Sequence, residues 1–440
     1  MNKIITIIII LLISHCSFDS KTGIWKGNEK KITENVKFKD FVNLSNRKNS
    51  FNSVIEPPNN LSLKLDSFVT PKKWLDRYYQ NTNNQENFNY KSLNQLIYKS
   101  KKLSKYIINE NILFDGENFI ISDEKGNIII FSLEQKKTIL KYNFYKKKYK
   151  ISKKILKITA KENILYVSDN LGYVYALDYL NNKILWAKNF QIPFRSNIKI
   201  SNNIIIVSDQ NNSLYFLNKF DGSKTRVVPT EDMTLKNNFI NSIAISTNSF
   251  LFLNTYGSLY SFDSEDLKIN WFINLNQSFD LNPANLFYSN PIVIKNNYII
   301  ISSDLYLHIV NKDTGQLLIK YPISSIVTPI ISGENIFIIT KDNLLVSLNL
   351  KKKEVIYSLD ISKEIGNFLK TKNKPINIKN LSLVNNNLYV YLDNSYFVKF
   401  NINGKIKNIN KLPQKIYEYP IFVDQNLLYL NNKNKLIVLN

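Results

Sequence analysis

The residue types that most often do acid–base, nucleophilic or metal chemistry are scarce in this chain. Its 440 residues include two histidines, one cysteine and 11 glycines. No His, Cys and carboxylate cluster has the spacing of a metal site, and neither a nucleophile elbow nor a phosphate-binding glycine loop is present. His308 stands in the run Leu305-Tyr306-Leu307-His308-Ile309, and a single histidine in a strand is far more often packed than catalytic. We therefore expect no enzyme activity, no metal and no cofactor.

The single cysteine, Cys16, stands directly behind an export signal. Lys3 precedes the apolar run Ile4 to Ile13, which is too short to span a bilayer permanently. Leu12-Ile13-Ser14-His15-Cys16 resembles a bacterial lipoprotein signal, in which the cysteine becomes the lipidated first residue. His15 departs from that pattern, because a small residue usually stands there, and an ordinary signal peptide is the alternative. Either way the mature chain has no disulfide.

These observations predict a signal peptide of lipoprotein type over residues 1–15 and lipidation at Cys16. No second apolar run of spanning length follows, so the membrane is reached through the lipid anchor. Ser17, the residue behind the cysteine, is compatible with sorting to the outer membrane. We expect the protein on the periplasmic side of the cell outer membrane, anchored by lipid.

The formal charge of +23 invites a nucleic-acid or anionic-membrane partner. The lysines are scattered, however, and the tightest runs, Lys146 to Lys148 and Lys351 to Lys353, fall where turns between strands are expected. We expect solvated loops and no nucleic-acid partner, while contact with anionic lipid stays open.

Residues 16–70 show no sustained period, and they carry polar runs such as Pro57-Pro58-Asn59-Asn60. They are predicted to form an extended tether. From about residue 93 the chain becomes repetitive. Each copy has a strand that closes on an apolar residue followed by Asp, Asn or Ser, at Phe131-Ser132, Leu177-Asp178, Leu217-Asn218, Phe262-Asp263, Val310-Asn311, Leu348-Asn349, Phe400-Asn401 and Leu439-Asn440.

The eight copies lie 38 to 52 residues apart, which is the period of a β-propeller blade. Gly172 ends a hairpin turn in the clearest copy. Its counterparts are also Gly or Asn, the residues that tolerate a left-handed backbone: Gly126, Asn212, Gly257, Asn343 and Asn434. The sequence predicts an all-β fold, with an eight-bladed β-propeller over residues 71–440.

The last copy ends with the chain at Asn440, so its blade lacks an outer strand. An exposed edge strand invites aggregation, and propellers commonly close the ring with a strand from the other terminus. Leu96-Ile97-Tyr98 precedes the first full copy and carries an aromatic residue at the position held by Trp186 elsewhere. We predict that this N-terminal strand closes the ring.

The repeat resembles the PQQ-like repeat through Tyr175-Ala176-Leu177-Asp178 and Leu185-Trp186. Ile269-Asn270-Trp271 and Asn311-Lys312-Asp313-Thr314-Gly315 match in part, and Trp186 and Trp271 are the expected blade-packing residues. Eight such blades behind a lipoprotein signal are similar to the BamB family of the outer-membrane β-barrel assembly machinery. The resemblance covers about residues 72 to 440.

This resemblance implies a scaffold that binds the POTRA region of a BamA-like partner through loops on one face. Phe194 and Arg195 in Gln191-Ile192-Pro193-Phe194-Arg195-Ser196 correspond to the family's partner-binding loop. Its acidic neighbour aligns near Asn238 to Asn241, where this chain has no acid. Glu231 and Asp232 lie upstream and are the acids that could take its place. A loop arginine that bonds its own blade's carbonyls is the alternative for Arg195.

Two classes of function stay open. The first is a non-catalytic scaffold that aids insertion of outer-membrane proteins, with unfolded outer-membrane proteins as a further class of partner. The second is a periplasmic propeller that binds a quinone cofactor or another small ligand in its channel. Quinone enzymes share this repeat but commonly carry a vicinal disulfide over the cofactor, which a chain with one cysteine cannot form.

Overall fold

The computed structural model describes residues 51–145, 149, 151–232, 239–276, 286–417 and 419–440, together with the backbone of two short strands near the N-terminus. The chain divides into units of residues 1–49 and 50–440. In the first unit, β1 (Ser17–Phe18) pairs antiparallel with β2 (Trp25–Lys26). The predicted signal peptide and Cys16 lie outside the described residues, as does the run Lys146 to Lys148. Across the described ranges we find no helix that is long and apolar enough to cross a membrane.

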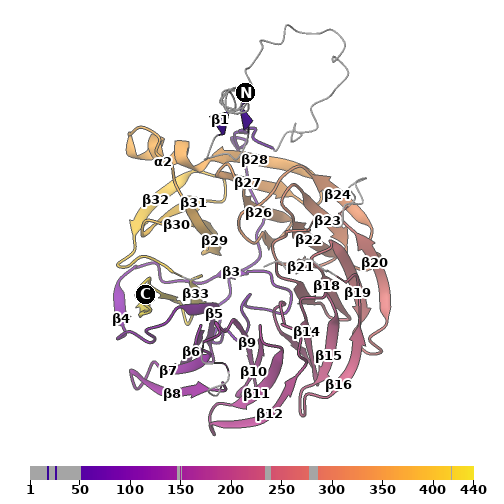
Figure 1. Cartoon of the computed structure of the whole chain (residues 1–440). Coiled ribbons are helices and arrows are strands. Elements are labelled where there is room, and N and C mark those ends of the chain that lie inside the picture. The colour runs from indigo at the N-terminus through magenta and orange to yellow at the C-terminus, as the bar shows by residue number, and fades with distance from the viewer. Residues whose placement is uncertain are drawn as a thin grey trace, which may run out of the picture. The chain divides into compact units, whose positions relative to one another are not determined.

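Eight antiparallel sheets of four strands, one of them joined by a fifth strand, surround a central channel in the second unit (Figure 1). We number these blades along the chain and their strands from the channel outwards. Blade one contains β5 (Ile108–Phe114), β6 (Asn118–Asp123), β7 (Asn127–Ser132) and β8 (Lys137–Asn143), and blade two contains β9 (Leu156–Lys161), β10 (Ile164–Asp169), β11 (Tyr173–Asp178) and β12 (Lys183–Asn189). Blade three contains β13 (Lys199–Ser201), β14 (Ile204–Ser208), β15 (Leu214–Asn218) and β16 (Lys224–Val228), and blade four contains β17 (Ser242–Ile245), β18 (Ser249–Leu253), β19 (Ser258–Asp263) and β20 (Ile269–Asn274). Blade five contains β21 (Val293–Lys295), β22 (Tyr298–Ser302), β23 (Leu307–Asn311) and β24 (Leu317–Tyr321), and blade six contains β25 (Ile330–Ser332), β26 (Asn335–Ile339), β27 (Leu344–Asn349) and β28 (Glu354–Asp360). Blade seven contains β29 (Ile378–Val384), β30 (Asn387–Leu392), β31 (Tyr396–Asn401) and β32 (Ile406–Lys411), with β3 (Asn87–Phe88) as the additional strand on β29. Blade eight contains β33 (Ile421–Val423), β34 (Asn426–Leu430), β35 (Leu436–Leu439) and β4 (Leu96–Lys99).

The burial of each strand follows its place in the blade. All six residues of β6 and of β7 are buried, whereas most of the outer strand β8 is exposed. Middle strands are covered on both faces by neighbouring blades, which suits their runs of isoleucine and valine, because β-branched side chains pack well on a pleated surface. The predicted all-β, eight-bladed propeller is confirmed.

The turn positions inferred from the repeat also hold. Gly172 and its five predicted counterparts all have a left-handed backbone, with φ between 56° and 89°. In every blade the register between the third and fourth strands shifts at one equivalent place, as between Ala176 and Leu177. Such a bulge increases the local twist of the outer strand.

The N-terminal strand closes the ring as predicted. Strand β4 pairs antiparallel with β35, and Tyr98 stands opposite Val438 immediately before the bulge. This is the position that Trp186 holds opposite Ala176 in blade two. The last blade therefore has its outer strand, and the edge of β35 is covered.

The two tryptophans of the repeat join neighbouring blades. Trp186 donates its indole N–H to the carbonyl of Lys219 at 2.9 Å, and Trp271 donates to the carbonyl of Lys312 at 3.1 Å. Each ring lies on a glycine of the next blade's outer turn, where a Cβ atom would approach the ring to 2.5 Å at Gly222 and likewise at Gly315. Any larger residue there would separate the blades.

Residues 51–70 are extended, but they lie against the ring, and the compact unit begins at Ser50 rather than at the predicted residue 71. Ile55 exchanges backbone hydrogen bonds with Ser358 of β28 at 2.8 and 2.9 Å. Leu61, Leu63 and Leu65 pack on the core between blades six and seven. Within the predicted tether, these residues therefore belong to the folded unit.

Candidate partner-binding face and the filled channel

Residues 66–91, which we call the channel segment, lie across the central channel. Figure 1 shows them as the indigo trace that crosses the middle of the ring through β3. The segment meets the channel where the first strand of each blade turns into the second, and polar contacts join it to all eight blades. The contacts on the blade side are Phe114, Ala160, Lys199, Ile245, Ile294, Ile331, Asn385 and Asp424.

Two consecutive asparagines supply much of this bonding. Asn83 donates its side-chain amide to the carbonyls of Ile243 and Ile292, at 3.0 and 2.9 Å, and so joins blades four and five. Asn84 donates to the carbonyl of Ile331 at 2.9 Å and accepts from the same residue's N–H at 3.0 Å. The innermost strands would otherwise present unpaired backbone groups to the channel, and buried backbone groups need partners.

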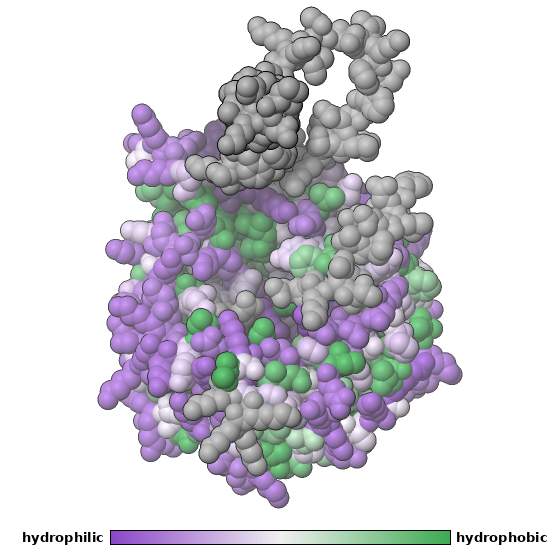
Figure 2. Space-filling view, viewed as in Figure 1, coloured by the Kyte–Doolittle hydropathy of each residue, from purple (hydrophilic) through white to green (hydrophobic). Residues whose placement is uncertain are grey.

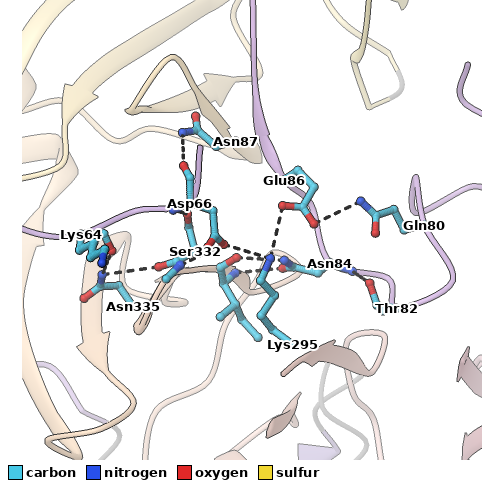
Figure 3. Close-up of polar contacts among 12 residues, drawn as sticks. Lys64, Asp66, Gln80, Thr82, Asn84, Glu86, Asn87, Lys295, Ser332 and Asn335 are labelled. Atoms are coloured by element: carbon cyan, nitrogen blue, oxygen red, sulfur yellow. Dashed lines mark hydrogen bonds and ion pairs between the residues drawn. The ribbon is translucent and has the colours of Figure 1, made fainter. Parts of the chain in front are cut away.

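Lys295 extends from blade five into an acidic pair on the channel segment (Figure 3). Its ammonium lies 3.0 Å from Asp66 and 3.5 Å from Glu86. Burial by itself would lower the pKa of Lys295, but the two carboxylates outweigh it, and the net shift is upward. Asp66 also accepts the N–H of Gly333 at 3.0 Å, so the ion pair ties the segment to blades five and six.

A second lysine, two blades away in blade three, is fully buried. Lys199 of β13 contacts Asp76 at 2.9 Å and donates to the carbonyl of Gln80 at 2.7 Å. Burial lowers the pKa of this lysine, although Asp76 opposes that shift. A buried charge is tolerated only when it is paired and hydrogen-bonded, and the channel segment provides both.

This arrangement does not fit a quinone cofactor at the filled end of the channel. The inner-strand groups that a ligand would meet already bond to the channel segment. Beside Trp74 and Asn83 there remains a cavity of about 30 Å³, which is room for one or two water molecules. Within the parts of the chain that the structure describes, no three His, Cys, Asp or Glu residues are grouped as a metal site would require.

Among the described residues, the other mouth of the channel contains a funnel of about 540 Å³, which lies among the loops that lead into blades one to four and blade eight. Its lining includes the cations Lys153, Lys157 and Arg195, and the apolar side chains Ile155 and Ile240. None of the described lining residues is a carboxylate, and Asn109 and Asn170 are the side chains there that offer the amide oxygens calcium can also accept.

The predicted binding residues Phe194 and Arg195 occupy this mouth in different ways. Phe194 is only 3% exposed, and it packs edge-on against Phe190 and Tyr215, so it holds the loop in place. Arg195 is half-buried in the funnel wall. Its backbone N–H donates to Ser208, but its guanidinium has no hydrogen bond or ion pair with any described residue. The alternative, in which this arginine bonds its own blade's carbonyls, is not what the structure shows.

The two predicted acids also differ. Glu231 turns into blade four and accepts hydrogen bonds from Asn254, Ser258 and Tyr260. Burial raises the pKa of its carboxyl, but these bonds outweigh that effect and hold the pKa below its usual value. Asp232 is exposed at the edge of the described residues. Glu231 therefore braces the loop, and Asp232 is the acid that faces solvent.

Backbone and amide contacts fix the two loops to each other. Ser196 forms a bridge with Asn241, and Asn197 exchanges hydrogen bonds with the backbone of Ile243 at 2.8 and 2.9 Å. The loop of Arg195 and the loop that carries Ile240 are thus held in one rigid arrangement. Ile240 is 41% exposed at this mouth.

Eight blades of this repeat define the chain as a PQQ-repeat β-propeller. A family model described as outer membrane protein assembly factor BamB matches residues 135–358. The chain belongs to the BamB family. A comparison with curated proteins finds no match.

Solved structures share the fold at low identity. The crystal structure of BamB from Moraxella catarrhalis has a TM-score of 0.60 and 13% identity, and the match covers 79% of this chain and 99% of that chain. A quinohemoprotein alcohol dehydrogenase from Comamonas testosteroni has a TM-score of 0.62 and 7% identity, with 84% and 80% covered. At these identities the likeness shows the fold alone.

Proposed function

We propose that this protein is a non-catalytic scaffold of outer-membrane protein assembly and that its open funnel face binds the POTRA region of a BamA-like partner. Family membership supports the role. The observation that supports this binding surface is the state of Arg195, because its guanidinium is half-buried yet has no partner among the described residues. Arginine is always charged, and its planar group suits bidentate contact with a carboxylate.

The surroundings of Arg195 have the character of an interface centre. The exposed Ile240 and Ile155 stand beside it, and apolar residues with an arginine are typical of the core of protein interfaces. The rigid loops would dock with little rearrangement. Asp232 is the acid available at the rim. Unfolded outer-membrane proteins are a second class of partner that such apolar loops suit.

The proposed location is the periplasmic side of the outer membrane, where lipidated Cys16 anchors the chain. Mass spectrometry of the purified N-terminus tests this, because a diacylglycerol on Cys16 is the expected finding. An unmodified cysteine, or cleavage at another residue, would contradict the anchor and leave the ring's binding role untouched.

The test of the scaffold is affinity capture from the protein's own envelope fraction. We expect a barrel protein with POTRA domains to co-purify, and Arg195→Glu to reduce its recovery at least about tenfold, because reversing a buried interfacial charge costs several kcal/mol. Lys137→Glu is the matched control, since this exposed lysine lies on an outer strand. Full recovery with a folded Arg195→Glu variant would show that this face is not the contact.

A small anionic ligand is the second candidate, and the volume and cationic lining of the funnel favour it. A quinone with calcium is the specific case raised by the shared repeat. Reconstitution with both should then produce cofactor absorbance that survives gel filtration. A spectrum identical to that of the untreated protein would remove this candidate.

A further inference from the structure

The one helix among the described residues, α2 (Ile361–Leu369), is inserted between β28 and β29. Asp360 caps its start by accepting the backbone N–H groups of Ser362 and Lys363, and Lys370 ends it with a left-handed φ of 53°. One side of the helix packs on the ring through Ile361, which is fully buried. Its far end makes no such contact.

That far end combines exposed apolar side chains with lysines. Phe368 and Leu369 are 45% and 51% exposed. The exposed residues that follow include Lys370, Lys372 and Lys374, and no salt bridge joins these three lysines to a described carboxylate. In the part of Figure 2 where Figure 1 labels α2, hydrophobic surface lies directly beside hydrophilic projections.

Adjacent aromatic and aliphatic residues beside clustered lysines are typical of segments that lie in a membrane interface. The apolar side chains enter the headgroup region while the lysines are attracted to anionic lipids. The acids at the start of α2 are Asp360 at its N-cap and Glu364 in its first turn, with Glu56 close to Glu364. Residues 368–374 contain lysines and no acid.

The route of the chain places the same edge of the ring next to the N-terminal unit in sequence. Residues 51–55 join the ring on the side of blade six, where Phe51 bonds to the carbonyl of Pro322 and Ile55 pairs with Ser358. Ser358 lies only three residues before Ile361. The chain therefore enters the folded unit at the edge that bears α2.

We propose that the end of α2 and the loop that follows it, residues 368–374, form a contact site for an anionic phospholipid surface. This contact is separate from the funnel face and from acylation of Cys16. It holds the blade-six edge against the bilayer and leaves the funnel free for a protein partner.

The test is co-sedimentation of the chain from residue 16 onward, carrying Cys16→Ser so that no acyl chain contributes. We expect binding to phosphatidylethanolamine vesicles that contain phosphatidylglycerol, and little binding to phosphatidylcholine alone. Replacing Lys370, Lys372 and Lys374 with Gln should weaken binding at least about tenfold, and the pair Phe368→Ser, Leu369→Ser should weaken it as well.

The matched control replaces Lys351, Lys352 and Lys353 with Gln. These lysines are also exposed, in the turn between β27 and β28, and so lie at the opposite end of β28 from α2. This triple variant should bind as the parent does. Equal losses from the two triple variants would show that net charge alone drives binding and would overturn the proposal. Absence of binding to phosphatidylglycerol vesicles would also overturn it.

A second measurement reads the site directly. In Phe368→Trp, brominated lipid in phosphatidylglycerol vesicles should quench the fluorescence of the introduced tryptophan. In Phe220→Trp it should not, because Phe220 lies in the outer turn of blade three. Unquenched fluorescence at position 368 in protein that has bound vesicles would place the contact elsewhere.

Discussion

The blades that cover a single residue in this ring can shift its pKa far from the usual value. His308 illustrates this, because it is only 1% exposed and its ring lies near those of Phe287 and Tyr306. Burial, with a smaller contribution from nearby Lys320, lowers the pKa of His308 to about 4. These surroundings are those of a packed histidine.

This histidine should make the free energy of unfolding depend on pH. The unfolded chain protonates it near pH 6.5, whereas the folded chain stays neutral down to about pH 4. Unfolding takes up a proton in that window, so stability falls as the pH drops from 6.5 to 4, by about 3 kcal/mol for this residue. Urea denaturation at pH 7 and pH 4.5 should show a smaller decrease in His308→Leu. An equal decrease in both proteins would contradict the shifted pKa.

At the scale of elements, the channel segment depends on ion pairs that its own residues complete. Lys199 is fully buried, and Asp76 is its only carboxylate partner among the described residues. Removing one member of a buried pair leaves an uncompensated charge, whereas removing both does not.

We therefore expect Asp76→Ala to lower the free energy of unfolding by about 3 to 5 kcal/mol. The double variant Asp76→Ala, Lys199→Met should be clearly more stable than Asp76→Ala alone. A double-mutant cycle by chemical denaturation measures the difference. If the second substitution gave no recovery, the lysine would not be charged in the folded protein.

Some elements of the fold could be predicted from the sequence, and others could not. The blades, their left-handed turns and the closing strand were predictable, because a repeated unit shows the same residue at the same place many times, as Gly172 and Asn212 do. The channel segment occurs once and has no period, so Asn83 and Asn84 looked like any polar loop. One sign of helix α2 was present in the sequence, because the helix is inserted in the longest interval between copies, which separates Leu348 from Phe400.

The binding face was predictable only in part. Resemblance to a family placed the loop of Arg195, and the structure puts that side chain at the funnel. It could not show that Phe194 is buried or that Glu231 accepts hydrogen bonds from residues of blade four. Burial and hydrogen bonding depend on residues that are distant in the chain, such as Tyr260, which lies 29 positions after Glu231, and a local pattern does not reach that far.

On the scale of the whole molecule, the ring is a closed chain of contacts whose final junction is β4 against β35. Deletion of residues 93–101 would leave β35 as a bare edge. Each blade packs between two neighbours around the ring, so we expect the loss of this junction to destabilise the whole ring.

The deletion variant should therefore melt at a lower temperature and lose its single cooperative transition in calorimetry. Addition of a synthetic peptide of residues 93–101 should restore part of the transition, whereas a peptide of scrambled sequence should not. A deletion variant that melts like the parent would show that closure by β4 contributes nothing to stability.

The same junction has a consequence for how the protein is made. The hydrogen bond from Leu436 to Ser100 joins residues 336 positions apart, and folding slows as contacts become more distant in sequence. Because the chain is synthesised from its N-terminus, β4 and the channel segment lack some of their partners until the last blade has been made. Until then the nascent chain has strand edges without partners, and such edges make a folding intermediate prone to aggregation.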